Sequence, residues 1–151
     1  MDENYRQLDV WKKSVAVAAQ LYELTSRFPE RERQGLATEI RRAASSIATN
    51  IAEGWGHQST GEYLLFWTKA RTLLIELRTH LTVALNLGFL ESADYVAVSE
   101  PLHEVGKMLN RLIGILKSQT KAARRGAACP VSQLPCPLGR STNTVPPVSS
   151  T

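Results

Sequence analysis

The chain has 151 residues, of which 43% are hydrophobic and 21% charged, a composition typical of one globular domain with a real core. Its net charge of +4 permits contact with nucleic acid or an anionic surface without requiring it. No apolar run approaches the roughly 20 residues of a membrane helix, and the polar start "MDENYRQLDVWKK" does not resemble a secretory signal. We therefore expect a cytoplasmic protein with no membrane partner.

Hydrophobic periodicity predicts four helices within residues 1–125. They are expected to run from residue 4 or 8 to 27, from 33 to 54, from 59 or 60 to 87, and from 92 onward. Long helices joined by short links become antiparallel neighbours. The sequence thus predicts an all-α fold, an antiparallel up-down-up-down four-helix bundle.

Several residues are expected to set the ends of these helices. Gly54 and Gly56 are predicted to stop the second helix, because glycine adopts the left-handed conformation without penalty. Ser59 has capping-box spacing to Glu62 at the start of the third helix. Pro101 is expected to kink the fourth helix or to separate its first turn.

The composition changes at Gly126. Residues 126–151 hold five of the seven prolines (130, 135, 137, 146 and 147) and many Ser and Thr residues, so we expect a disordered tail beyond the bundle domain of residues 1–125. Both cysteines, Cys129 and Cys136, lie in this tail. Their spacing is wider than that of the usual zinc-binding pair, and we expect free thiols.

The first and third helices each carry two apolar stripes. In the first helix we expect the stripe that contains Leu8, Trp11, Val15 and Tyr22 to face the core. A strip of apolar residues left on the outside favours a partner surface, here a second copy of the chain. The predicted outer residues are Val10, Val17, Leu21, Leu24, Leu65, Ile75 and Val83. The alternative is that loops or the tail cover them.

A polar flank follows the second helix and reaches the glycine turn. Glu53 lies near the helix C-terminus, where the macrodipole disfavours an anion, so a cation or backbone N–H groups should compensate it. The flank is predicted to form a hydrogen-bonded corner between the second and third helices in preference to a ligand site. The residues of this corner are Asn50, Glu53, Gly54, Gly56 and Ser59.

Catalysis finds little support in the sequence. The histidines His57, His80 and His103 are scattered, and no nucleophile motif accompanies them. His80 lies one helical turn after Glu76, a spacing typical of a surface pair. We predict no enzymatic activity, no metal site and no cofactor.

Basic residues are the stronger functional signal. No aromatic RNA-binding motif or zinc finger accompanies them, so any binding of RNA or DNA should be driven by charge. One chain carries only a modest basic surface, and several copies of the chain in a ring would multiply the number of its contacts with a nucleic acid. The candidate residues are Arg41, Arg42, Arg71, Arg78, Lys107, Arg111, Lys117, Lys121, Arg124 and Arg125.

Four segments together carry a family resemblance over about residues 8–118: "LDVWKKS", "FPERERQGLATEIRRAASSIATNIAEGWGHQSTGEYLLFW", "ELRTHLTVALNLGFL" and "VGKMLNRLIGILK". They resemble the bacterial 23S rRNA intervening sequence proteins, which are similar in fold to the accessory variability proteins of diversity-generating retroelements. The resemblance implies a homopentamer of four-helix bundles with a basic surface and a role in binding nucleic acid. Positions that match the family pattern are Arg41, Arg42, Asn50, Glu53, Gly54 and Gly56, whereas Glu39, His57 and Pro101 depart from it.

Two functional hypotheses follow. The first is a non-enzymatic homo-oligomer that binds structured RNA or DNA by charge, as an accessory to another machine. The alternative is a protein-interaction scaffold with no nucleic-acid role, which presents its outer face or its tails to another protein.

Overall fold

The computed structural model describes residues 3–57 and 59–126. Within these ranges the chain forms two short 3-10 helices and four α-helices, and it contains no strand. The elements are η1 (Glu3–Gln7), α1 (Asp9–Thr25), η2 (Glu30–Glu32), α2 (Leu36–Gly56), α3 (Thr60–Asn86) and α4 (Ser92–Arg124). The predicted all-α, four-helix architecture is confirmed. The predicted tail beyond Gly126, with Cys129 and Cys136, lies outside the described residues.

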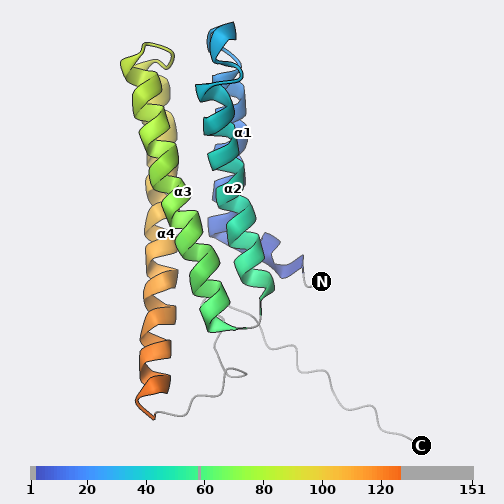
Figure 1. The fold of residues 1–151 in the computed structure, drawn as a ribbon, viewed down its shortest axis with the longest axis vertical. Helices are drawn as coiled ribbons and strands as arrows, with labels where there is room; N and C mark the ends of the chain where they lie inside the picture. The colour runs from blue at the N-terminus through green and yellow to red at the C-terminus, as the bar shows by residue number, and fades with distance from the viewer. Residues whose placement is uncertain (1–2, 58, 127–151) are drawn as a thin grey trace, which may run out of the picture.

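Each long helix runs back along the one before it, and the links alternate between the two ends of the bundle (Figure 1). The helices contact in the order α1–α2–α3–α4, and α4 closes the bundle against α1. Fully buried side chains from all four helices, including Leu21, Ile40, Leu77 and Leu109, fill the space between them. In the described ranges, no helix combines the length and apolar character needed to cross a membrane.

The orientation predicted for the first helix is wrong. Val10, Val17, Leu21 and Leu24, expected outside, are all buried in the core of the single chain. Val15 and Tyr22, expected inside, are 39% and 49% exposed.

Two hydroxyl residues explain the error. Ser14 and Thr25 interrupt the true inner stripe, yet both are buried. Each hydroxyl donates to a carbonyl one turn earlier in α1, Ser14 to Val10 and Thr25 to Leu21, both at 2.7 Å. Because these bonds satisfy the hydroxyls within the helix, the polar positions are compatible with a buried face.

The predicted faces of α3 agree with the structure. Leu74, Leu77 and Leu81 are buried, whereas Leu65, Ile75 and Val83 are 53%, 62% and 41% exposed. The exposure of these three side chains is therefore confirmed, and α3 presents an apolar strip to the outside.

The helix ends agree in part with expectation. Ser59 is the N-cap of α3, and its hydroxyl accepts the backbone N–H of Glu62. Gly88, after α3, has the left-handed φ of 74°. Gly54 and Gly56, by contrast, have no positive φ, and α2 continues through both of them. Pro101 lies inside α4, which runs unbroken from Ser92 to Arg124, so the predicted separate first turn is wrong.

Candidate nucleic-acid interface

The corner between α2 and α3 is held by aromatic donors from α3. The indole N–H of Trp67 donates to the carbonyl of Ile51 at 3.3 Å, and the hydroxyl of Tyr63 donates to the carbonyl of Trp55, also at 3.3 Å. Trp55 is among the last four residues of α2, whose carbonyls lack partners within the helix, whereas the Ile51 carbonyl, one turn earlier, accepts the indole with its second lone pair. The rings of Tyr63 and Trp67 meet edge to face, with centroids 5.4 Å apart.

Gly54 makes this arrangement possible. A Cβ at this position would lie 2.7 Å from Cδ1 and Nε1 of Trp67, closer than real Cβ atoms approach. Glycine is therefore needed for a close approach between helices, and not for a left-handed turn. Gly56 is exposed, and a Cβ there would meet nothing within 4 Å.

Asn50 and Glu53 do not have the roles predicted for them in the corner. The Asn50 amide donates to the carbonyl of Ser46 at 2.8 Å, within α2 itself. Glu53 is exposed, and its carboxylate makes no hydrogen bond or ion pair with the described residues. The corner predicted from the sequence does not include Tyr63 or Trp67. Their i, i+4 spacing just after the predicted helix stop was the available signal.

Ser59 does take part in the corner. Its hydroxyl donates to the Glu62 carboxylate at 2.7 Å, and His57 Nδ1 lies 3.6 Å from the other carboxylate oxygen. The hydrogen bond from Ser59, with a smaller contribution from the charge of His57, lowers the pKa of Glu62 below its ordinary value.

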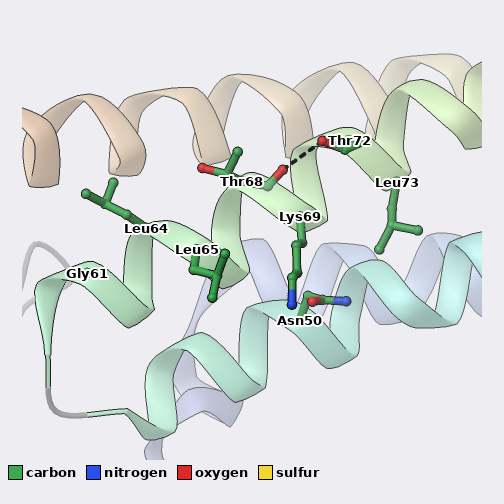
Figure 2. A pocket seen from close by; sticks show the side chains of 8 residues that line it. All are labelled: Asn50, Gly61, Leu64, Leu65, Thr68, Lys69, Thr72 and Leu73. Atoms are coloured by element: carbon green, nitrogen blue, oxygen red, sulfur yellow. Dashed lines mark hydrogen bonds between the residues drawn. The ribbon is translucent and has the colours of Figure 1, made fainter.

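A shallow groove of about 650 Å³ crosses the outer side of α3 (Figure 2). Three leucines, Leu64, Leu65 and Leu73, make it largely apolar, and the threonines Thr68 and Thr72 lie along its length. Lys69 extends from α3 toward Asn50 on α2 at its edge (Figure 2). Through Leu65 the groove is continuous with the exposed strip of α3.

Arg41 and Arg42, two of the predicted nucleic-acid contacts, are committed to contacts inside the chain. Arg41 Nε donates to the Thr25 hydroxyl at 2.8 Å, a second nitrogen donates to the Tyr22 carbonyl at 3.2 Å, and the guanidinium lies 4.9 Å from the centroid of the Tyr22 ring. The residue therefore ties α2 to the C-terminal turn of α1, where a cation is favourable.

Arg42 bridges two acidic residues on different helices. One nitrogen lies 2.8 Å from a Glu39 oxygen on α2 and 2.6 Å from a Glu76 oxygen on α3. Hydrogen bonds and charge from Glu39, then from Glu76, raise the pKa of Arg42. Its charge is compensated within the chain, so the geometry does not support Arg42 as a free phosphate contact.

The basic residues of α4 are differently placed. All six are exposed, and none makes an ion pair with any residue that the structure describes: Lys107, Arg111, Lys117, Lys121, Arg124 and Arg125. The sequence from Val105 to Gly126 contains no acidic residue. Glu104, just before it, is already paired with Lys13 from α1. The second half of α4 is consequently a surface of exposed positive charge, in which only Lys107 lies near enough to a carboxylate, that of Glu104, to help lower its pKa.

Arg71 and Arg78 on α3 are only half-buried and lie apart from this surface in the chain. The Arg78 guanidinium packs toward α4, 3.9 Å from where a Cβ of Gly106 would be. The ten predicted contacts thus fall into three groups. Arg41 and Arg42 bind other residues of the chain, Arg71 and Arg78 are half-buried on α3, and the other six are exposed on α4.

Comparison with known proteins agrees with this architecture. The model of the 23S rRNA-intervening sequence protein family matches residues 6–111. The chain belongs to this family. Among solved structures, a protein of unknown function from the S23 ribosomal protein family of Bacteroides thetaiotaomicron superposes with a TM-score of 0.65 at 21% identity, covering 70% of this chain and 95% of that one. Comparison with curated proteins finds no match.

The family match divides the basic surface of α4. Lys107 and Arg111 lie within the residues that match the 23S rRNA-intervening sequence proteins, whereas Lys117, Lys121, Arg124 and Arg125 follow them. The corner around Gly54 and Trp67 lies wholly within the matched segment. At 21% identity, the S23 relative supports the fold alone.

Proposed function

We propose that this member of the 23S rRNA-intervening sequence protein family is a non-enzymatic, cytoplasmic homo-oligomer that binds RNA or DNA by charge through the second half of α4. The observation that carries the proposal is the run of six exposed cations from Lys107 to Arg125 with no acidic residue among them. At 1.5 Å per residue, the run covers about 27 Å of helix.

The cations share one side of α4. At 100° per residue, all six fall within an arc of about 140°, away from the buried stripe of Val105, Leu109, Leu112 and Leu116. Lysine and arginine side chains that contact phosphates release the counterions condensed on the nucleic acid. This release favours binding that does not depend on the base sequence. Six cations are few for tight binding by one copy, so the proposal includes self-association, which multiplies weak contacts.

Self-association is supported by the exposed apolar residues of two helices. Leu65, Ile75 and Val83 form the strip on α3, and Val15 and Tyr22 are exposed on α1. Two different apolar faces on one chain suit a head-to-tail interface, which closes into a ring when the rotation allows. A pentamer is the ring that the family resemblance implies.

The test measures binding of a labelled structured RNA and a duplex DNA across a salt series. The variant K107Q/R111Q/K117Q/K121Q removes four cations of α4. The control K12Q/R27Q/R31Q/R33Q removes four exposed cations elsewhere, three of them near the α1–α2 link at the opposite end of the bundle (Figure 1). We expect log affinity to fall linearly with log salt, and the slope to shrink in the α4 variant alone. No binding at low salt, or equal losses in both variants, would overturn the proposal.

The mass of the parent in solution tests the oligomer. Ile75→Glu places a charge in the α3 strip. Glu23→Gln, on the exposed surface of α1, is the control for a surface substitution outside the strip. We expect Ile75→Glu to reduce the mass toward a monomer with its helix content intact. A monomeric parent would exclude self-association without excluding the basic surface.

The apolar groove beside Leu65 favours a second candidate function, a protein-interaction scaffold. A partner bound there would be retained after nuclease treatment and in high salt, because apolar contacts are not screened. Loss of every partner on nuclease treatment favours the nucleic-acid function.

A further inference from the structure

Three potential metal ligands from two helices meet beside Arg42. Glu39 lies in the first turn of α2, and Glu76 and His80 lie one turn apart on the facing side of α3. One ligand atom from each residue falls within 4.8 Å of the other two. All three residues are half-buried. The sequence did not predict a metal site, because Glu39 is remote in the chain from the pair on α3.

The position of Arg42 shows that this place already holds a positive charge. A single guanidinium nitrogen contacts Glu39 at 2.8 Å and Glu76 at 2.6 Å. The same oxygen of Glu76 lies 3.7 Å from His80 Nε2. Two of the three ligand groups therefore contact one cationic atom, and the third, His80, lies beside the Glu76 oxygen that they share.

We propose that Glu39, Glu76 and His80 form a binding site for a divalent transition metal ion of the zinc class, for which the Arg42 guanidinium is the competing occupant. A site with one imidazole nitrogen and two carboxylate oxygens suits Zn²⁺ better than Mg²⁺ or Ca²⁺, which take more ligands and prefer oxygen. The fourth position would be filled by water.

The geometry requires only side-chain movement. Ligand atoms about 2.1 Å from a tetrahedral ion are about 3.4 Å apart, so separations of up to 4.8 Å must shorten by at most about 1.4 Å. Glutamate and histidine rotamers supply this movement, while α2 and α3 hold the backbones in place. Arg42, with a side chain 51% exposed, can swing into solvent without leaving a buried charge.

The experiment uses the full chain with Cys129→Ser and Cys136→Ser, because thiols in the tail would bind the same metals. Zn²⁺ is titrated by calorimetry, and Co²⁺ by its visible absorption. We expect one ion per chain, and a loss of at least tenfold in affinity in His80→Ala and in Glu76→Gln. His103→Ala, an exposed histidine on α4, is the matched control and should leave the affinity unchanged.

Arg42→Gln separates a metal site from a purely structural ion-pair network. Removing the competing cation should tighten Zn²⁺ binding severalfold, and Zn²⁺ should then raise the melting temperature of this variant more than that of the parent. Circular dichroism establishes that each variant is folded, and Glu39→Gln replaces His80→Ala if the latter does not fold. Absence of one-to-one binding, equal losses in His103→Ala, or weaker binding in Arg42→Gln would each overturn the proposal.

Discussion

Gly54 and Trp67 are in contact across the α2–α3 corner at a distance that excludes any side chain at residue 54. A Cβ there would lie 2.7 Å from two atoms of the indole and 3.2 Å from the Cβ of Phe66. The indole that fills this space is 1% exposed and donates to the Ile51 carbonyl. The close approach and the hydrogen bond therefore depend on the same glycine.

Gly54→Ala should destabilise the protein by about 1–2 kcal/mol, because overpacking outweighs the better helix propensity of alanine. Gly114→Ala on α4 is the matched control. A Cβ there meets nothing within 4 Å, so we expect a gain of about 0.5–1 kcal/mol. Urea unfolding at one fixed protein concentration measures both changes. A Gly54→Ala variant as stable as the parent would show that the indole can move aside.

Arg41 should matter for stability and not for nucleic-acid binding. Arg41→Gln loses two hydrogen bonds from a charged donor to α1 and should cost about 1–3 kcal/mol. Arg111→Gln, on the free surface of α4, should leave stability within about 0.5 kcal/mol and reduce the salt slope of binding. Urea unfolding and the salt series are applied to both variants. The opposite pattern would restore Arg41 as a phosphate contact.

The two faces of α1 should respond differently to truncation. Leu21 is fully buried, so Leu21→Ala should cost about 2–5 kcal/mol. In the monomer, Val15→Ala should change the free energy of unfolding by no more than about 0.5 kcal/mol, because this side chain is already 39% exposed. Comparable losses in the two variants would contradict the orientation of α1.

The Ser59–Glu62 pair should make stability depend on pH. The pKa of Glu62 in the folded chain lies below its ordinary value of 4.5, so its charged form favours folding. This contribution is present above the unfolded-state pKa and is lost as pH falls through the folded-state pKa. Glu62→Gln should thus be less stable than the parent at neutral pH and equally stable once Glu62 of the parent is protonated in strong acid.

Thermal melts across the pH range test this expectation, with Glu53→Gln as control. Glu53 lies in the last turns of α2 and makes no hydrogen bond or ion pair with described residues, so its substitution should not reproduce the pH dependence. A difference between Glu62→Gln and the parent that persists in strong acid would point to lost packing and not to charge.

Features that depend on residues close in sequence were predictable. The helix count, the cap at Ser59 and the end of the third helix near residue 87 all follow from spacing within one helix or turn. The exposed strip of α3 followed in the same way, because its polar neighbours mark the outer side. For α1 the same method chose the wrong face, since Ser14 and Thr25 hide their hydroxyls by bonding within the helix.

Features that depend on contacts between helices were not predictable. The partners of Arg41 lie 16 and 19 residues earlier in the chain, and Glu76 lies 34 residues after Arg42. Nothing in local spacing distinguishes these arginines from the free cations of α4. The same applies to Gly54. From the sequence alone, a glycine required for close packing against Trp67 cannot be distinguished from a glycine that ends a helix.

Because α4 is much longer than α1, the basic residues at its C-terminal end lie beyond the part of the helix that packs in the core. The helix α4 has 33 residues against 17 in α1, and its lower end extends beyond α2 and α3 (Figure 1). Its last buried residue is Leu116, and Lys117, Lys121, Arg124 and Arg125 all follow it. Substitutions in that segment can change the charge of the molecule while leaving the core untouched. The positive charge of this end of α4 can therefore be raised or lowered by substitution without a matching change in stability.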